Sequence, residues 1–278
     1  MFSSLLLRNA FVVFFLVTVF AFCKKRSTTL QILPNDIIET QPATVTAVSM
    51  KLNVSFAGYY IALPEHYELT TKKYPVIIYL HGAGQMGNGT TELNYILKDG
   101  IGKILDQKKL PPDFNIGGKH YSFIVLSPQT SKIPQAIEVY EFINYVKNTF
   151  RIDEKRIYLS GLSAGAKAAT LTAAAYPDLF SALVPMAGVP LNSGFDARCD
   201  TIARHNLPVW GFHNVDDPLS DVRDMQRFVK TISDFSPNPL PLLTIFDVYG
   251  HDAWTTPLNP EYKEHGMNIY EWMLQYSR

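Results

Sequence analysis

A serine framed by glycines is the first residue of this sequence whose type and surroundings could do chemistry. Residues 161–165 read Gly-Leu-Ser-Ala-Gly and fit the pattern G-x-S-x-G around Ser163. A serine hydroxyl becomes a nucleophile when a base takes its proton and an acid orients that base. A strand-like run precedes Ser163 and a helix-like run follows it, which is the context in which this pattern exposes a reactive hydroxyl. We therefore predict that Ser163 is a catalytic nucleophile.

Side chains later in the sequence could complete this chemistry. His251 comes directly after the strand-like segment 243–248, and the adjacent carboxylates Asp216 and Asp217 follow the strand-like segment 209–212. Because the carboxyl ends of parallel strands meet at one edge of a sheet, these loops are expected to converge on Ser163. The sequence therefore predicts His251 as the base and one of the two aspartates as the orienting acid.

Strand-like and helix-like segments alternate along the chain, which predicts an α/β fold with a mostly parallel sheet covered on both faces. The loops between these segments are short, so we expect one domain over residues 43–278 without a lid domain. The expected strands are Val45–Leu52, Ser55–Leu63, Pro75–Leu80, Phe123–Leu126, Arg156–Ser160, Ala182–Met186, Val209–Phe212 and Leu243–Val248. The expected helices are Ile101–Lys109, Ile133–Phe150, Ala164–Tyr176, Asp221–Ser233 and Tyr262–Tyr276.

Composition excludes several classes of protein. The 278 residues include 25 Lys+Arg and 25 Asp+Glu, so the net charge is zero and argues against capture of nucleic acid. Hydrophobic residues make up 47% of the chain, which argues against intrinsic disorder. Two cysteines cannot build a disulfide framework, and without an H-E-x-x-H motif or paired cysteines no metal is expected.

The first residues of the chain are typical of export. The uncharged apolar run 10–22 is too short to span a bilayer, so residues 1–22 are interpreted as a signal peptide. Cys23 follows this run and resembles the lipidated cysteine of bacterial lipoproteins, although Phe22 stands where a small residue is preferred. Residues 23–42 are then a tether, and the protein is expected to be secreted, periplasmic or on the outer surface, held at a membrane. An uncleaved anchor helix is the alternative, and the basic residues 24–26 favour it.

A glycine-rich stretch offers a competing interpretation. Residues 82–87 spell G-x-G-x-x-G after a strand-like segment, the pattern of a dinucleotide site, with Asp106 at the distance of a ribose-binding acid. Asp106, however, lies in the helix-like stretch 101–109 and not at the end of a second strand. No nucleotide or other cofactor is therefore expected.

Four motifs taken together resemble those of the α/β-hydrolase superfamily. They are His81-Gly82-Ala83-Gly84, Gly161–Gly165, His213…Asp217 and Gly250-His251…Trp254. Within the superfamily the chain is most similar to compact secreted esterases: feruloyl and acetylxylan esterases, polyhydroxybutyrate depolymerases and dienelactone-hydrolase-like proteins. The resemblance implies an eight-stranded-type sheet, an acid at Asp217, four residues after His213, and an oxyanion hole formed by the N–H groups of Ala83 and Ala164.

The resemblance implies a serine esterase that acts on a small-molecule, polysaccharide or polyester substrate. Trp254 is expected either to line the substrate site or to pack against the loop of His251. Asn214 departs from the glycine that relatives usually carry after the equivalent of His213. A peptidase of the prolyl-oligopeptidase type, or a binding protein that has kept the fold without activity, remains an alternative.

Overall fold

A computed structural model describes residues 31–278 of the chain. The expected signal peptide, residues 1–22, and Cys23 lie outside the described residues. Among the residues described, none of the helices has the length and apolar character needed to cross a bilayer.

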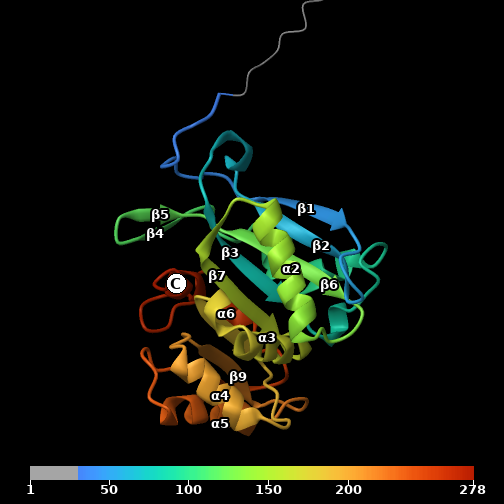
Figure 1. Ribbon diagram of the computed structural model, residues 1–278, viewed down its shortest axis with the longest axis vertical. Coiled ribbons are helices and arrows are strands. Elements are labelled where there is room, and N and C mark those ends of the chain that lie inside the picture. The colour runs from blue at the N-terminus through green and yellow to red at the C-terminus, as the bar shows by residue number, and fades with distance from the viewer. Residues whose placement is uncertain (1–30) are drawn as a thin grey trace, which may run out of the picture. The chain divides into compact units, whose positions relative to one another are not determined.

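Eight strands form one sheet in the spatial order β1-β2-β6-β3-β7-β8-β9-β10 (Figure 1). The first two pairings, β1 with β2 and β2 with β6, are antiparallel, and every later neighbour is parallel. The predicted fold class is therefore confirmed. The strands are β1 Thr44–Ser49, β2 Phe56–Leu63, β3 Tyr74–Leu80, β6 Ile124–Thr130, β7 Ile152–Leu162, β8 Ala182–Met186, β9 Trp210–Asp216 and β10 Leu242–Tyr249.

The central strands are buried on both faces, as parallel strands are when helices cover the sheet. Every residue of β3 and of β6 is buried. Alternate side chains of β3 enter two separate cores. Val76 and Ile78 pack in the core that contains residues of α2 (Ala136–Thr149), α3 (Ala164–Ala175), α4 (Phe195–Arg204) and α5 (Val222–Asp234). Ile77 and Tyr79 pack in the core that contains residues of α1 (Gly100–Asp106), α6 (Thr255–Leu258) and α7 (Ile269–Met273). Figure 1 shows α2 and α3 in front of the sheet.

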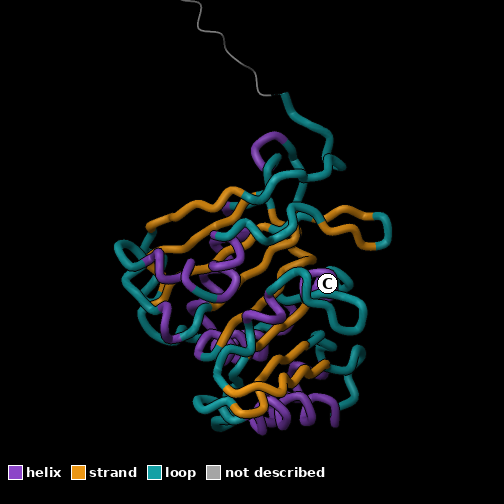
Figure 2. The backbone as a smooth tube through the Cα atoms, turned by 180° about the vertical axis from the view of Figure 1, so that it is seen from behind, coloured by secondary structure: helices purple, strands orange, loops and turns teal. Residues whose placement is uncertain are grey.

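Within residues 31–278, five of the seven α-helices lie between strands in the sequence, and the last two follow β10. The helices are α1 Gly100–Asp106, α2 Ala136–Thr149, α3 Ala164–Ala175, α4 Phe195–Arg204, α5 Val222–Asp234, α6 Thr255–Leu258 and α7 Ile269–Met273. Short 3₁₀ helices occur at Tyr67–Leu69, Ala83–Gln85, Leu93–Lys98 and Pro177–Leu179. A small hairpin, β4 Phe114–Ile116 with β5 Lys119–Tyr121, projects from the sheet in both views (Figures 1 and 2).

The expected helix over residues 262–276 is wrong for most of its length. Only α7 is helical there, because His265 and Gly266 both have a positive φ, which interrupts a right-handed helix. The helix begins after Asn268, whose side chain accepts a hydrogen bond from the backbone N–H of Glu271 in a capping box. Helix α4 and the β4–β5 hairpin were not predicted.

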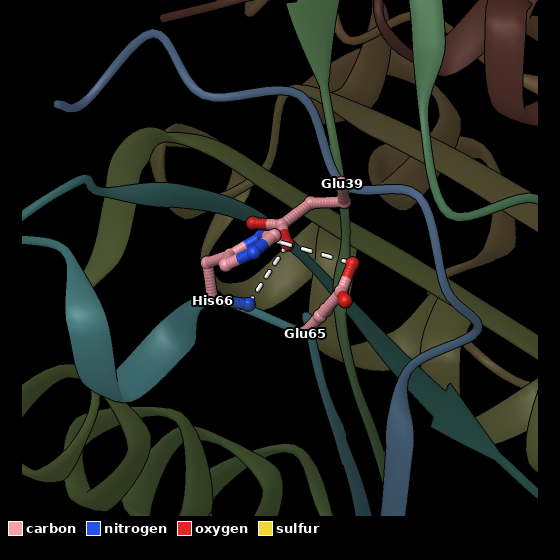
Figure 3. A group of neighbouring side chains, drawn as sticks. All are labelled: Glu39, Glu65 and His66. Carbon is pink, nitrogen blue, oxygen red and sulfur yellow. Dashed lines mark hydrogen bonds and ion pairs between the residues drawn. The ribbon is translucent and has the colours of Figure 1, made fainter. Parts of the chain in front are cut away.

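The domain begins earlier than the predicted boundary at residue 43. Residues 33–41, assigned to the tether, are hydrogen-bonded to the loop before β3, as Figure 3 shows for Glu39. The buried Glu39 carboxylate accepts hydrogen bonds from the backbone N–H and Nδ1 of His66 and from the Tyr74 hydroxyl. Glu65 accepts hydrogen bonds from the backbone N–H and the hydroxyl of Thr40 in return. These contacts make the described part of the predicted tether a component of the packed domain.

Candidate active site

Ser163 occupies a sharp turn between β7 and α3. Its φ of 51° and ψ of −115° lie in a region that non-glycine residues seldom adopt, and such strain is typical of functional turns. The backbone N–H of Ser163 donates to the carbonyl of Met186 at the end of β8, at 2.8 Å. The predicted strand–turn–helix around Ser163 is therefore present.

The two glycines of the pentapeptide are required because backbones approach closely at this turn. A Cβ atom on Gly165 would lie 2.0 Å from the carbonyl oxygen of Leu80, and one on Gly161 would lie 2.6 Å from the backbone of Gly165. Neither neighbour is a flexible side chain that could move aside. The turn can therefore pack against the end of β3 only with glycine at both positions.

The substitution Gly165→Ala is expected to destabilise the fold by about 3 kcal/mol, because the new methyl group would collide with the backbone of β3. Urea unfolding followed by circular dichroism measures this difference. Gly84→Ala is the matched control, since a Cβ at Gly84 would have no atom within 4 Å, and its unfolding midpoint should stay close to that of the wild type. A Gly165→Ala protein with a wild-type midpoint would contradict the packing described here.

The side chain of His251 links the serine to one aspartate. His251 lies in the loop after β10, and its Nε2 is 2.8 Å from the Ser163 Oγ. Its Nδ1 is 2.7 Å from Oδ2 of Asp217. Because a carboxylate only accepts hydrogen bonds, Nδ1 carries the proton and Nε2 is free to accept the hydroxyl proton of Ser163. The structure thus brings together the residues predicted as nucleophile, base and orienting acid.

Asp217 is held by hydrogen bonds on both of its oxygens. Its side chain is fully buried, and Oδ1 accepts from the backbone N–H groups of Leu219 and Ser220 at 2.8 and 3.1 Å. The buried His213 places Nε2 3.3 Å from Oδ2 and 2.8 Å from the Ser220 carbonyl. These contacts fix the direction in which the Asp217 carboxylate faces His251. Asp216, the alternative acid, is an exposed residue at the end of β9.

Asn214 positions the loop that carries His251. Its buried side chain donates through Nδ2 to the carbonyl of Gly250 at 2.8 Å, directly before His251. Gly250 has a φ of 123°, a conformation that other residues rarely adopt. Asn214 stands where relatives usually carry glycine, which has no side chain to make this bond. In this chain the Asn214 side chain therefore connects β9 to the loop of His251.

The two residues predicted for the oxyanion hole begin helical turns next to Ser163. Ala164 is the first residue of α3, and Ala83 is the first residue of the 3₁₀ turn after β3. The first N–H groups of a helix have no partner within it, so they can donate to an anion.

His81 ties the loop that carries Ala83 to the sheet. Its Nδ1 donates to the carbonyl of Gly82 at 2.7 Å, and its Nε2 accepts from the N–H of Thr130 at 2.9 Å. Burial lowers the pKa of His81, which keeps the ring neutral and suits this pair of bonds. His81 therefore holds the loop of Ala83 through hydrogen bonds.

A cavity of about 260 Å³ adjoins Ser163 and His251. Trp254 lines this cavity, and its ring also meets the ring of His251 edge to face at a centroid distance of 5.3 Å. Trp254 therefore fulfils both of the predicted alternatives: it lines the cavity and it packs against His251. The other lining residues are Gly82, Ala83, Gly84, Gln85, Asp99, Leu162 and Leu219. Of these, Asp99, Gln85 and Leu219 were not identified from the sequence.

The competing dinucleotide pattern does not have the expected surroundings. Residues 83–85 form a 3₁₀ turn, and Asp106 is the last residue of α1. A dinucleotide fold would place that acid at the end of a second strand.

Comparisons with known proteins agree with this architecture. A curated relative, poly(3-hydroxyalkanoate) depolymerase C of Paucimonas lemoignei, is 28% identical over 116 residues, which make up 42% of this chain and 28% of that protein. The chain thus matches less than a third of this relative's length.

Solved structures share the fold. A thermostable esterase superposes with a TM-score of 0.59 at 21% identity, covering 84% of this chain and 63% of that one. The feruloyl esterase module from Clostridium thermocellum superposes with a TM-score of 0.54 at 15% identity, covering 84% and 91%. Residues 67–260, which make up most of the described chain, match the phospholipase/carboxylesterase family. The chain belongs to the phospholipase/carboxylesterase family of α/β-hydrolases.

Proposed function

We propose that this protein hydrolyses carboxylic esters through a triad of Ser163, His251 and Asp217. The observation that carries the proposal is the pair of contacts made by His251, 2.8 Å to the Ser163 Oγ and 2.7 Å to Asp217 Oδ2. Membership of the phospholipase/carboxylesterase family supports the class of reaction. The depolymerase relative suggests that polyesters are among the substrates to be tested.

In the proposed first step the Ser163 oxygen attacks the ester carbonyl while its proton passes to Nε2 of His251. Asp217 keeps the imidazole in the required tautomer and stabilises the imidazolium that forms. The N–H groups of Ala83 and Ala164 donate to the oxyanion of the tetrahedral intermediate. Collapse of the intermediate expels the alcohol, which takes the proton from His251, and leaves the acyl group on Ser163.

In the second step a water molecule replaces the alcohol. His251 takes a proton from this water as the water attacks the acyl-enzyme, and the same histidine returns the proton to Ser163 as the carboxylic acid leaves. No metal or organic cofactor enters either step. The cavity beside Ser163, with Trp254 on its wall, receives part of the ester.

Parallel assays of the full-length protein test the proposed reaction class. We expect hydrolysis of p-nitrophenyl butyrate and little release of p-nitroaniline from a peptide anilide. An enzyme that cleaves the anilide as efficiently as the ester would favour the peptidase alternative. A folded protein that cleaves neither compound would favour the alternative of a binding protein without activity.

A further inference from the structure

One carboxylate beside Ser163 has no part in the proposed hydrolysis. Asp99 lines the catalytic cavity and is the only acidic side chain among its ten lining residues. It lies in the loop before α1, 64 positions before the serine in the sequence. A charged group on the wall of a small cavity must affect which esters enter it.

Asp99 is held in one orientation by neighbouring groups. Its Oδ1 accepts a hydrogen bond from Nε1 of Trp254 at 2.7 Å and one from the backbone N–H of Gly100 at 2.8 Å. Gly100 has a φ of 58°, and a Cβ there would lie 2.4 Å from the Tyr79 hydroxyl, so the backbone beside Asp99 is closely packed. Trp254 is itself 7% exposed and packs against His251. The carboxylate is therefore preorganised at a fixed position near the catalytic histidine.

The surroundings of Asp99 leave its charge available to a ligand. Among the described residues it forms no ion pair with a lysine, arginine or histidine. Both recorded hydrogen bonds end on Oδ1, so Oδ2 retains its capacity to accept. Other parts of the cavity wall come from the apolar side chains of Leu162 and Leu219. In such an environment a carboxylate attracts a hydrogen-bond donor and repels an anion more strongly than it would in water.

We propose that Asp99 is a specificity-determining residue, which binds a hydroxyl group of the ester and disfavours esters that carry a carboxylate. The proposal rests on the ester hydrolysis proposed above. A polar group in a binding site disfavours an ester that leaves this group without a hydrogen-bond partner or that carries a charge of the same sign. Such selectivity between substrates is larger than the selectivity that apolar contacts alone provide. The substrate class is thus neutral, hydroxylated esters, whether the hydroxyl lies on the acyl or on the alcohol side.

The test compares kcat/KM across matched esters for the wild type and Asp99→Asn. The acyl series consists of p-nitrophenyl butyrate, p-nitrophenyl 3-hydroxybutyrate and p-nitrophenyl hemisuccinate. The alcohol series consists of phenyl butyrate, 4-(hydroxymethyl)phenyl butyrate and 4-carboxyphenyl butyrate. Asparagine keeps an oxygen for Trp254 but removes the charge. In at least one series we expect the ratio of kcat/KM for the anionic ester to that for the neutral ester to rise about 10-fold in Asp99→Asn. In the same series the preference for the hydroxylated ester should fall. Because the intrinsic reactivity of each ester is the same for both proteins, it cancels when the ratio for Asp99→Asn is divided by the ratio for the wild type.

Two control variants distinguish the effect of the Asp99 charge from the effect of a structural change near the site. Asp106→Asn removes an exposed carboxylate from the far end of α1, and its ratios should equal those of the wild type. Trp254→Phe removes the donor to Asp99 and keeps the charge, so the discrimination against anionic esters should persist. Equal ratios for the wild type and Asp99→Asn in both series would overturn the proposal while leaving the hydrolase function intact. A wild type that cleaves none of these esters would overturn both.

Discussion

The Ser163→Ala protein is expected to lose about 10⁴- to 10⁶-fold in kcat on p-nitrophenyl butyrate, because no nucleophile remains to form the acyl-enzyme. The fold should be retained, since the packing of this turn depends on the backbone bond to Met186 and on the flanking glycines. KM is expected to change far less than kcat, because the cavity and the oxyanion donors remain.

Steady-state kinetics with a matched control measures this loss. Ser193→Ala removes an exposed serine in the loop before α4, and it should leave kcat unchanged. A Ser163→Ala protein that retains more than about a tenth of wild-type kcat would exclude Ser163 as the nucleophile.

Asp217→Asn is expected to lower kcat by about 10⁴-fold while leaving the protein folded. The asparagine amide would present a donor or a weak acceptor to Nδ1 of His251 in place of a carboxylate. His251 would then favour the tautomer that carries its proton on Nε2, where it can no longer accept the proton of Ser163. The imidazolium formed in the transition state would also lose its counter-charge.

The neighbouring carboxylate provides the control for this prediction. Asp216→Asn changes the same charge one residue earlier, but Asp216 is exposed and its side chain makes no recorded contact with His251. Its kcat should equal that of the wild type. The reverse pattern, a slow Asp216→Asn and a normal Asp217→Asn, would show that the acid has been assigned to the wrong residue.

Most of the sheet could be predicted because buried strands leave a continuous apolar signal. The run at residues 75–80 predicted a strand buried on both faces, and β3 is buried at each position. Helix α4 was missed although its buried residues Phe195, Cys199, Ile202 and Ala203 follow helical spacing. Apart from Ala197, its remaining positions are polar, so the segment resembled a loop. The helix predicted over residues 262–276 was too long. Its apolar periodicity favoured a helix, although Gly266 within the segment has a positive φ that interrupts one.

The candidate site was only partly predictable, for reasons of geometry. Ser163 and His251 each follow a strand, and the sheet brings such loops to one edge. The adjacent aspartates could not be distinguished from their own surroundings, and the choice of Asp217 depended on resemblance to a family. Asp99 gave no local signal, because its contact with Trp254 joins residues 155 positions apart.

Covalent labelling of Ser163 is the most direct test of the proposed catalytic site. The full-length protein is incubated with a fluorophosphonate, which reacts with a serine only when a base activates its hydroxyl. Intact-mass and peptide mass spectrometry should find one adduct per chain, on the peptide that contains Ser163, and should find none in Ser163→Ala. Labelling should also be much slower in a His251→Ala protein. An unlabelled wild type, or an adduct on a different serine, would contradict the account.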